Sequence, residues 1–178
     1  MKQHRDHKPR PPLDEEGLER LALFYAGRYA ATRAKLRTYL GRKVKERGWG
    51  GNGAPPIETL VAKLAALKYV DDQAFASARS AALTRRGFGE RRVGQALRAA
   101  GIEEEDAVPA REEARESAWA AALRFAERKR LGPFAEARPD HAGRQKAAGA
   151  MLRAGHPMDL VRRLLNASPG EIPDSDAS

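Results

Sequence analysis

Two adjacent aspartates, Asp71 and Asp72, are the residues whose type and spacing most directly suggest chemistry. They lie in the stretch KYVDDQAFA (residues 68–76), which holds two aromatic residues but no nucleophile. Neighbouring carboxylates can act as general acid and base or hold a metal ion, provided that partner groups lie nearby. The local sequence offers no such partners, whereas a helix start explains both residues. Asp71 stands where an N-cap belongs, and Asp72 falls in the first turn, where the helix dipole favours a carboxylate. We therefore predict that the pair begins a helix and does not catalyse a reaction.

Four histidines are the other candidates for acid–base or metal chemistry. His4 and His7 lie in a charged, proline-rich stretch, where we expect solvated side chains. His141 is expected in a loop, and His156 precedes a proline at a helix start, where a polar cap explains it. The chain has no cysteine, which excludes disulfides, thiolate metal sites and cysteine nucleophiles. We predict that the protein is not an enzyme and has no cofactor and no metal, with an enzyme built on the aspartate pair and a later histidine as the alternative.

The bulk composition of the 178 residues favours a soluble helical protein with an acidic partner. The chain is 42% hydrophobic and 32% charged, and Ala, Leu, Arg and Glu, which favour helices, dominate it. Its net charge of +9 and pI near 10.2 suit phosphates, acidic lipid or an acidic protein. No stretch approaches the roughly 20 apolar residues that span a bilayer, and the first residues lack the apolar segment of a secretory signal. We expect a cytoplasmic protein with no membrane partner.

Apolar residues recur at helical spacing along most of the chain, while the alternation typical of strands is absent. The sequence therefore predicts an all-α fold. A first helix is expected from Leu18, with its apolar stripe running to Tyr29. Thr32 is expected to cap a second helix, which ends before a turn-rich stretch at residues 48–56. The stripe of this second helix is expected to be Leu36, Tyr39, Leu40 and Val44.

The helix that follows the aspartate pair is expected to bury Phe75, Ala78 and Ala82, together with Leu83, on one face. The next helix is basic, and Gly101 is expected to end it as a C′ glycine. Four acidic residues, 103–106, then fall in the first turn of a short helix, where the dipole favours them.

Two prolines are expected to begin the last long helices. Pro109 suits the first position of a helix that reaches Arg130. Pro157 begins the final helix, of which Met158, Val161 and Leu164 are expected to face inward.

An internal repeat organises these helices. A lead helix, a basic middle helix, a turn and a closing helix occur three times, with the sequence Leu-Arg-Ala before glycine in two of the three units. The repeat predicts an elongated array of three tandem three-helix units with flexible tails. The expected segments are an N-terminal tail (1–17), a first unit with a Gly/Pro-rich insertion (18–70), a second unit (71–108), a third unit (109–167) and an acidic tail (168–178).

Basic residues concentrate on the middle helices of the repeats. Between Leu18 and Gly48 there are nine basic residues and two acidic ones, and between Leu83 and Gly101 five basic residues and one acidic one. A basic face repeated along a body suits a polyanionic filament better than a compact ligand, although many charge runs are only solvated helix faces. The candidate binding residues are Arg33, Lys35, Arg37, Arg42, Lys43, Arg85, Arg86, Arg91, Arg92, Arg98, Arg144 and Lys146.

The middle of the chain resembles the bacterial regulatory protein family RecX. The matching features are an aromatic–apolar–Asp-Asp start at residues 69–72, a Phe-Ala pair, an Arg-Gly turn at residues 86–87, an Arg-rich helix and a Gly-Ile stop at residues 101–102. The likeness extends from about Leu18 to Leu165. Lys68 departs from it, since the family carries glycine there; in a left-handed conformation a lysine would cost about 1 kcal/mol.

The resemblance implies a non-catalytic protein that binds the RecA recombinase in the groove of its nucleoprotein filament. It implies modulation, usually inhibition, of strand exchange, ATP hydrolysis and co-protease activity in recombination and DNA repair. The partners expected are therefore the RecA filament and single- or double-stranded DNA, contacted by a monomer through the basic residues given above. The alternative is a helix-turn-helix protein that binds DNA directly, which would require one recognition helix and a symmetric dimer.

Overall fold

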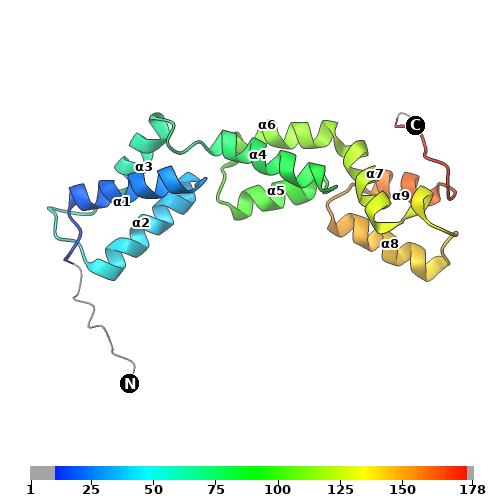
Figure 1. Ribbon diagram of the computed structural model, residues 1–178, viewed down its shortest axis with the longest axis horizontal. Coiled ribbons are helices and arrows are strands. Elements are labelled where there is room, and N and C mark those ends of the chain that lie inside the picture. Colours follow the sequence, from blue (N-terminus) through cyan, green and yellow to red (C-terminus); the bar gives the residue numbers. More distant parts are fainter. Residues whose placement is uncertain (1–10, 176–178) are drawn as a thin grey trace, which may run out of the picture. The chain divides into compact units, whose positions relative to one another are not determined.

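The computed structural model describes residues 11–175, which form nine α-helices, one short 3₁₀ helix and no strand beyond an isolated bridge (Figure 1). The predicted all-α fold is confirmed. The chain divides into two compact units, which we call unit 1 (to Asp72) and unit 2 (from Gln73). The elongated arrangement of three repeats remains a prediction. The helices are α1 (Glu15–Arg28), α2 (Arg33–Arg47), α3 (Ile57–Ala66), α4 (Asp72–Arg85), α5 (Glu90–Ala99), α6 (Glu104–Glu116), α7 (Ala118–Lys129), η1 (Gly132–Phe134), α8 (His141–Arg153) and α9 (Met158–Asn166).

Unit 1 is a bundle of α1, α2 and α3 around a leucine-rich core. As predicted, Thr32 caps α2, because its hydroxyl accepts a hydrogen bond from the Lys35 backbone N–H at 3.1 Å. Tyr29, predicted to continue the apolar stripe of α1, is instead 51% exposed, because α1 ends at Arg28 and the chain turns away. The buried core consists of Leu13, Leu18, Ala22, Leu36, Leu40, Leu60, Val61, Leu64 and Val70.

The segment just before α1 is part of unit 1, although the sequence placed it in a tail. The backbone of Leu13 pairs with the loop after α2, donating to the Gly48 carbonyl at 2.9 Å and accepting from the Gly50 N–H at 2.8 Å. Its side chain is buried. Asp14 then caps α1 by accepting from the Gly17 N–H at 2.8 Å, so the helix begins three residues before the predicted Leu18. His4 and His7 lie outside the described residues.

Lys68 adopts the left-handed backbone conformation that the resemblance suggested, with φ at +60°. It follows α3, where the Tyr69 N–H donates to the Leu64 carbonyl at 3.0 Å and closes the helix. A glycine would adopt this conformation without strain, so the lysine is destabilising here.

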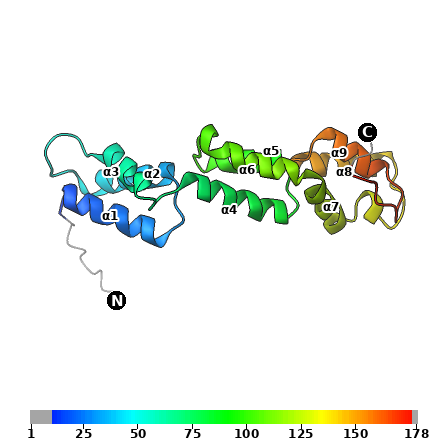
Figure 2. The same ribbon diagram turned by 90° about the horizontal axis from the view of Figure 1, so that it is seen from above.

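In unit 2, α4, α5 and α6 lie side by side in both views (Figure 1 and Figure 2) and share one core. The predicted face of α4 is confirmed for Phe75 and Leu83, which pack in this core, but not for Ala78. Ala76, Ser80 and Leu83 are buried, whereas Ala78 is exposed. The prediction was wrong for Ala78, because it chose alanines by spacing and passed over Ser80. This hydroxyl is buried and donates to the Ala110 carbonyl at 2.8 Å.

The predicted helix from Pro109 to Arg130 is two helices. Helix α6 begins at Glu104 and contains Pro109 in its second turn, and the break falls at Ser117. The predicted acidic first turn of α6 is confirmed. The two helices serve different cores: Ala107, Ala110 and Ala114 of α6 pack with α5, while Ala122, Phe125 and Ala126 of α7 pack with α8 and α9. A single straight helix could not turn its apolar stripe toward both.

Glycines let the turn before α5 approach the turn after α8 closely. As predicted, Gly87 and Gly89 bracket a turn and Gly101 ends α5, with φ at +78° for Gly87 and +73° for Gly101. The Gly89 N–H donates to the Ala154 carbonyl at 2.9 Å. A Cβ on Gly89 would lie 2.4 Å from the Gly155 carbonyl oxygen, and a Cβ on Gly155 would lie 2.4 Å from the Arg92 nitrogen. We call Gly87, Gly89 and Gly155 the glycine junction.

The end of the described chain folds back onto unit 2. The Gly170 N–H donates to the Pro133 carbonyl at 2.8 Å, so part of the segment predicted as a tail from residue 168 contacts the unit. In α9, Val161 and Leu164 are buried as predicted, whereas Met158 is 42% exposed because it is the first residue of the helix. Among residues 11–175, none of the helices combines the length and the apolar character that crossing a bilayer requires.

Candidate interaction surface

The five candidate residues on α2 fall into two groups with different surroundings. Arg33 and Arg37 flank the buried side of the helix and pair with carboxylates of unit 1. Lys35 and Arg42, seven residues apart, share an exposed face. Lys43 is half-buried and, like Arg42, pairs with Glu46. The structure therefore does not gather all five on one face.

Arg33 is held by Asp72. Oδ1 of Asp72 accepts from the Arg33 backbone N–H at 2.9 Å, and Oδ2 accepts from Nε of Arg33 at 3.1 Å. Arg33 is the first residue of α2, so this carboxylate satisfies a backbone donor that a helix leaves unpaired. Asp72 is only 5% exposed. Arg33 therefore contributes to the structure of unit 1, a role that its spacing in the sequence did not indicate.

The aspartate pair lies at a helix start, as predicted, and the two carboxylates have different partners. Asp71 directly precedes α4 and pairs with Nζ of Lys68 at 3.2 Å. Asp72 opens α4 as predicted, yet its carboxylate serves α2. Among residues 11–175 no group of three or more His, Cys, Asp or Glu side chains is placed to hold a metal ion.

Two ion pairs formed by basic residues of α2 lower the pKa of their glutamates. Arg37 donates from Nε and Nη2 to the two carboxylate oxygens of Glu58, at 2.6 and 2.8 Å, and these bonds lower the pKa of Glu58. The hydrogen bond from Lys43 likewise lowers the pKa of Glu46. Exposed pairs of this kind add little to stability and remain available for exchange with another anion.

Helix α5 carries an exposed basic stripe opposite its buried face. Val93, Gly94 and Leu97 are buried, whereas Arg91, Gln95 and Arg98 lie at i, i+4 and i+7 and are exposed, as the sequence predicted. Arg92 is exposed beside them, 3.4 Å from the amide oxygen of Gln95. We call Arg91, Arg92, Gln95 and Arg98 the α5 stripe.

Glu90 and Glu104, the acidic residues at the two ends of this region, both pair with Arg111 of α6. Nε of Arg111 donates to Glu90 at 2.6 Å, and another guanidinium nitrogen of Arg111 contacts Glu104. Both interactions raise the pKa of Arg111, with the bond to Glu90 as the largest cause. This half-buried triad ties α5 to α6 and keeps the carboxylate of Glu90 paired with Arg111.

Arg85 and Arg86 lie at the end of α4, beside two arginines of α7 that were not among the predicted binding residues. The guanidinium of Arg128 contacts the Arg86 carbonyl, and Nη2 of Arg124 donates to the Thr84 carbonyl at 3.4 Å. Arg86 and Arg128 both lie over the ring of Phe88, at 5.6 and 5.9 Å from its centre. The basic character of this region is therefore greater than the α4 sequence alone indicates.

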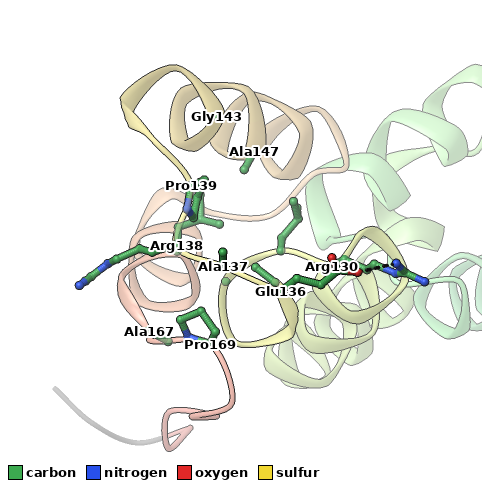
Figure 3. Close-up of a pocket in the computed structure, with 13 residues that line it drawn as sticks. Arg130, Glu136, Ala137, Arg138, Pro139, Gly143, Ala147, Ala167 and Pro169 are labelled. Carbon is green, nitrogen blue, oxygen red and sulfur yellow. Dashed lines mark hydrogen bonds and ion pairs between the residues drawn. The ribbon is translucent and has the colours of Figure 1, made fainter.

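The candidates on α8 are weaker. Arg144 is half-buried and donates to the Asn166 side chain at 2.5 Å, while Lys146 is exposed. A pocket of about 410 Å³ lies between the turn after α7 and the start of α8 (Figure 3), and its lining is mostly Ala, Leu, Gly and Pro. Of its three charged residues, Arg130 and Glu136 pair with each other at 3.0 Å, and Arg138 is exposed. The pocket thus offers no arrangement for acid–base chemistry.

His156 is a core residue and does not cap a helix, contrary to the prediction. It is fully buried, and Nε2 lies 3.0 Å from the Gly87 carbonyl oxygen. Because a carbonyl only accepts, Nε2 carries the proton, and Nδ1 is buried without a partner. Burial lowers the pKa of His156. His141 is exposed as the first residue of α8 and not in a loop.

Comparison with known proteins identifies relatives for most of the chain. No family model matches it. The regulatory protein RecX of Myxococcus xanthus is 32% identical over 166 residues, which cover 85% of this chain and 86% of that protein. The crystal structure of RecX from Lactobacillus salivarius superposes with a TM-score of 0.62 at 17% identity, covering 84% of this chain and 92% of that one. A second crystal structure of a regulatory protein RecX gives 0.59 at 20% identity, over 84% and 72% of the two chains.

Proposed function

Because the chain belongs to the RecX family of regulatory proteins, we propose that it binds the RecA nucleoprotein filament and lowers its recombinase, ATPase and co-protease activities. It does so without catalysing a reaction itself. The regulatory role follows from family membership, and RecA is the partner that the likeness of the central residues implies.

The observation that carries the proposal is the α5 stripe. Arg91 and Arg98 are exposed, and neither forms an ion pair with a carboxylate among the described residues, while Glu90 beside them is paired with Arg111. Charged side chains held by a rigid helix and not used in the fold are suited to an external anion. A filament built on DNA presents phosphates and acidic protein surface at regular spacing.

Mutating the α5 stripe tests the proposal directly. The variant with Arg91→Glu and Arg92→Glu should inhibit RecA ATP hydrolysis on single-stranded DNA more weakly. The protein concentration that gives half inhibition should rise at least tenfold. Two charge reversals at a contact with an anion cost well over the 1.4 kcal/mol that a tenfold change represents. Helicity by circular dichroism should be unchanged, since both side chains are exposed.

A matched control separates contact from net charge. Arg115→Glu with Lys129→Glu makes the same change in net charge at exposed positions outside the candidate set. This control should inhibit RecA nearly as well as the unmodified chain. If both variants lose inhibition equally, overall charge and not the α5 stripe governs binding, and equal full inhibition by both removes the α5 stripe from the interface.

A further inference from the structure

Aromatic residues at the end of α1 and the middle of α2 gather at the surface of unit 1. The rings of Tyr25 and Tyr39 stack with centres 4.3 Å apart and planes 15° apart, and Tyr29 lies 5.3 Å from Tyr25. Phe24, on the same turn of α1, is 58% exposed. An open concavity of about 300 Å³ is lined by Phe24, Tyr25, Tyr29, Tyr39 and Arg42, which we call the aromatic cluster.

Packing within unit 1 accounts for only half of the aromatic cluster. Tyr25 and Tyr39 pack against the leucine core. Phe24 and Tyr29 do not join that core, and each leaves more than half of its surface in water. Two large exposed rings next to each other are unusual on a soluble surface and mark places where another molecule binds.

Cations surround these rings. The Arg28 guanidinium lies 5.8 Å from the centre of Phe24 and 5.9 Å from that of Tyr29. Arg42 and Lys43 lie 5.8 and 5.9 Å from Tyr39. Arg28 forms no ion pair with a carboxylate among residues 11–175, so its charge is not neutralised there.

We propose that the aromatic cluster binds single-stranded nucleic acid, with bases stacking on Phe24 and Tyr29 and with Arg28, Arg42 and Lys43 contacting the backbone phosphates. Aromatic platforms next to cations are how proteins hold single strands without reading their sequence. A duplex cannot use such a platform, because its bases are already stacked on one another. A lipid surface would require a continuous aliphatic face, and the cluster offers rings rimmed by cations.

The inference goes beyond the proposed function and does not rest on it, since the strand is bound without RecA. Arg42 and Lys43 were already candidate binding residues, but Phe24, Arg28 and Tyr29 were not. The α5 stripe belongs to unit 2, whereas the aromatic cluster lies on α1 and α2 of unit 1. The two ideas can therefore fail separately.

The test measures binding of a fluorescent oligothymidine by anisotropy, with the full chain and no RecA. Phe24→Ala combined with Tyr29→Ala should weaken binding by about 5- to 150-fold for each stacked base that is lost. Tyr29→Phe keeps the ring and should keep the affinity. Tyr69→Ala is the matched control, because Tyr69 is also in unit 1 and 56% exposed but lies outside the cluster, and it should bind like the unmodified chain.

Two further measurements test the same site: the salt dependence of the affinity, and competition by unlabelled single strands and duplexes. Arg28→Gln should reduce the slope of log affinity against log salt by about 0.7, the value for one phosphate contact on a single strand. An unlabelled single strand should compete at much lower concentration than a duplex of the same length. Equal binding by the double variant and Tyr69→Ala would overturn the proposal, and so would preference for the duplex or no binding at low salt. RecA inhibition measured on the same double variant reports separately on the proposed function.

Discussion

Gly89, in the glycine junction of unit 2, has no room for a side chain. Gly89→Ala adds a single methyl group, but its Cβ would lie 2.4 Å from the Gly155 carbonyl oxygen and 2.8 Å from the His156 nitrogen. Both are backbone atoms, so no side chain can rotate away. The turn before α5 must then separate from the turn after α8.

The separation has two costs. Losing the bond between the Gly89 N–H and the Ala154 carbonyl leaves buried backbone groups unpaired, which costs about 1 to 3 kcal/mol. Displacing closely packed backbone costs about 1 to 3 kcal/mol more, as overpacking does elsewhere. Gly89→Ala should therefore lower the free energy of unfolding of unit 2 by about 2 to 6 kcal/mol, against a typical total of about 5 to 15 kcal/mol.

Two tryptophans make the assay specific to each unit, since Trp49 lies in unit 1 and Trp119 in unit 2. In a Trp49→Phe background, urea unfolding followed by Trp119 fluorescence should show the midpoint of the Gly89→Ala variant lowered by about 1 to 3 M, for a slope near 2 kcal/mol per M. The control is Gly41→Ala in unit 1, followed by Trp49 fluorescence in a Trp119→Phe background. Its Cβ would meet nothing within 4 Å, so it should stabilise α2 by about 0.5 to 1 kcal/mol. An unchanged midpoint for Gly89→Ala would refute the close contact between these two turns.

Three further predictions concern stability. Lys68→Gly should raise the stability of unit 1 by about 1 kcal/mol, because the residue has φ at +60°. A lower midpoint of urea unfolding, measured in a Trp119→Phe background, would contradict this conformation. Asp72→Ala should lower it by about 2 to 4 kcal/mol, since the Arg33 N–H and guanidinium lose a buried carboxylate; Asp71→Ala, the control at an exposed pair, should cost about 1 kcal/mol or less. Because burial lowers the pKa of His156, the unfolded chain takes up a proton below about pH 6.5 while the folded chain does not, so stability of unit 2 should fall as the pH is lowered from 7 to 5. His156→Gln, which can still donate to the Gly87 carbonyl, should remove most of this pH dependence, and an identical pH profile in both proteins would contradict it.

Several helix caps and helix ends were predicted correctly, because they depend on residues close together in the sequence. Thr32 caps α2, Gly101 ends α5, and the acids after it fall in the first turn of α6, because each depends on backbone groups within a few residues. The α5 stripe was also predictable, since a ten-residue helix with one buried stripe must expose the opposite one.

Other features depend on contacts between distant segments, which spacing does not reveal. Asp72 was expected to serve its own helix, but it binds a residue 39 positions earlier. The break at Ser117 separates α6 from α7, because the apolar stripes of these two helices pack into two different cores. Ser80 was overlooked as a buried position because its partner, the Ala110 carbonyl, lies 30 residues away.

The aromatic cluster escaped prediction for another reason. Helical spacing assigns Tyr25, Tyr29 and Tyr39 to apolar stripes and gives Phe24 no role. An aromatic pair followed by Arg-Tyr after two intervening residues (Phe24, Tyr25, Arg28, Tyr29) places rings on two adjacent turns with a cation beside them. That spacing is itself a local signal of an exposed aromatic–cationic surface, and it is legible in the amino-acid sequence.

The bond from Asp72 to Arg33 also bears on how the chain folds during synthesis. The ribosome delivers α2 first, and the carboxylate that completes its N-terminus comes 39 residues later. At about 5 to 20 residues per second, the nascent helices wait roughly 2 to 8 s for that group to be made. Asp72, the first residue of α4, therefore stabilises α2 only after a delay. Unit 1 reaches its full stability once translation has entered the segment that begins the next unit.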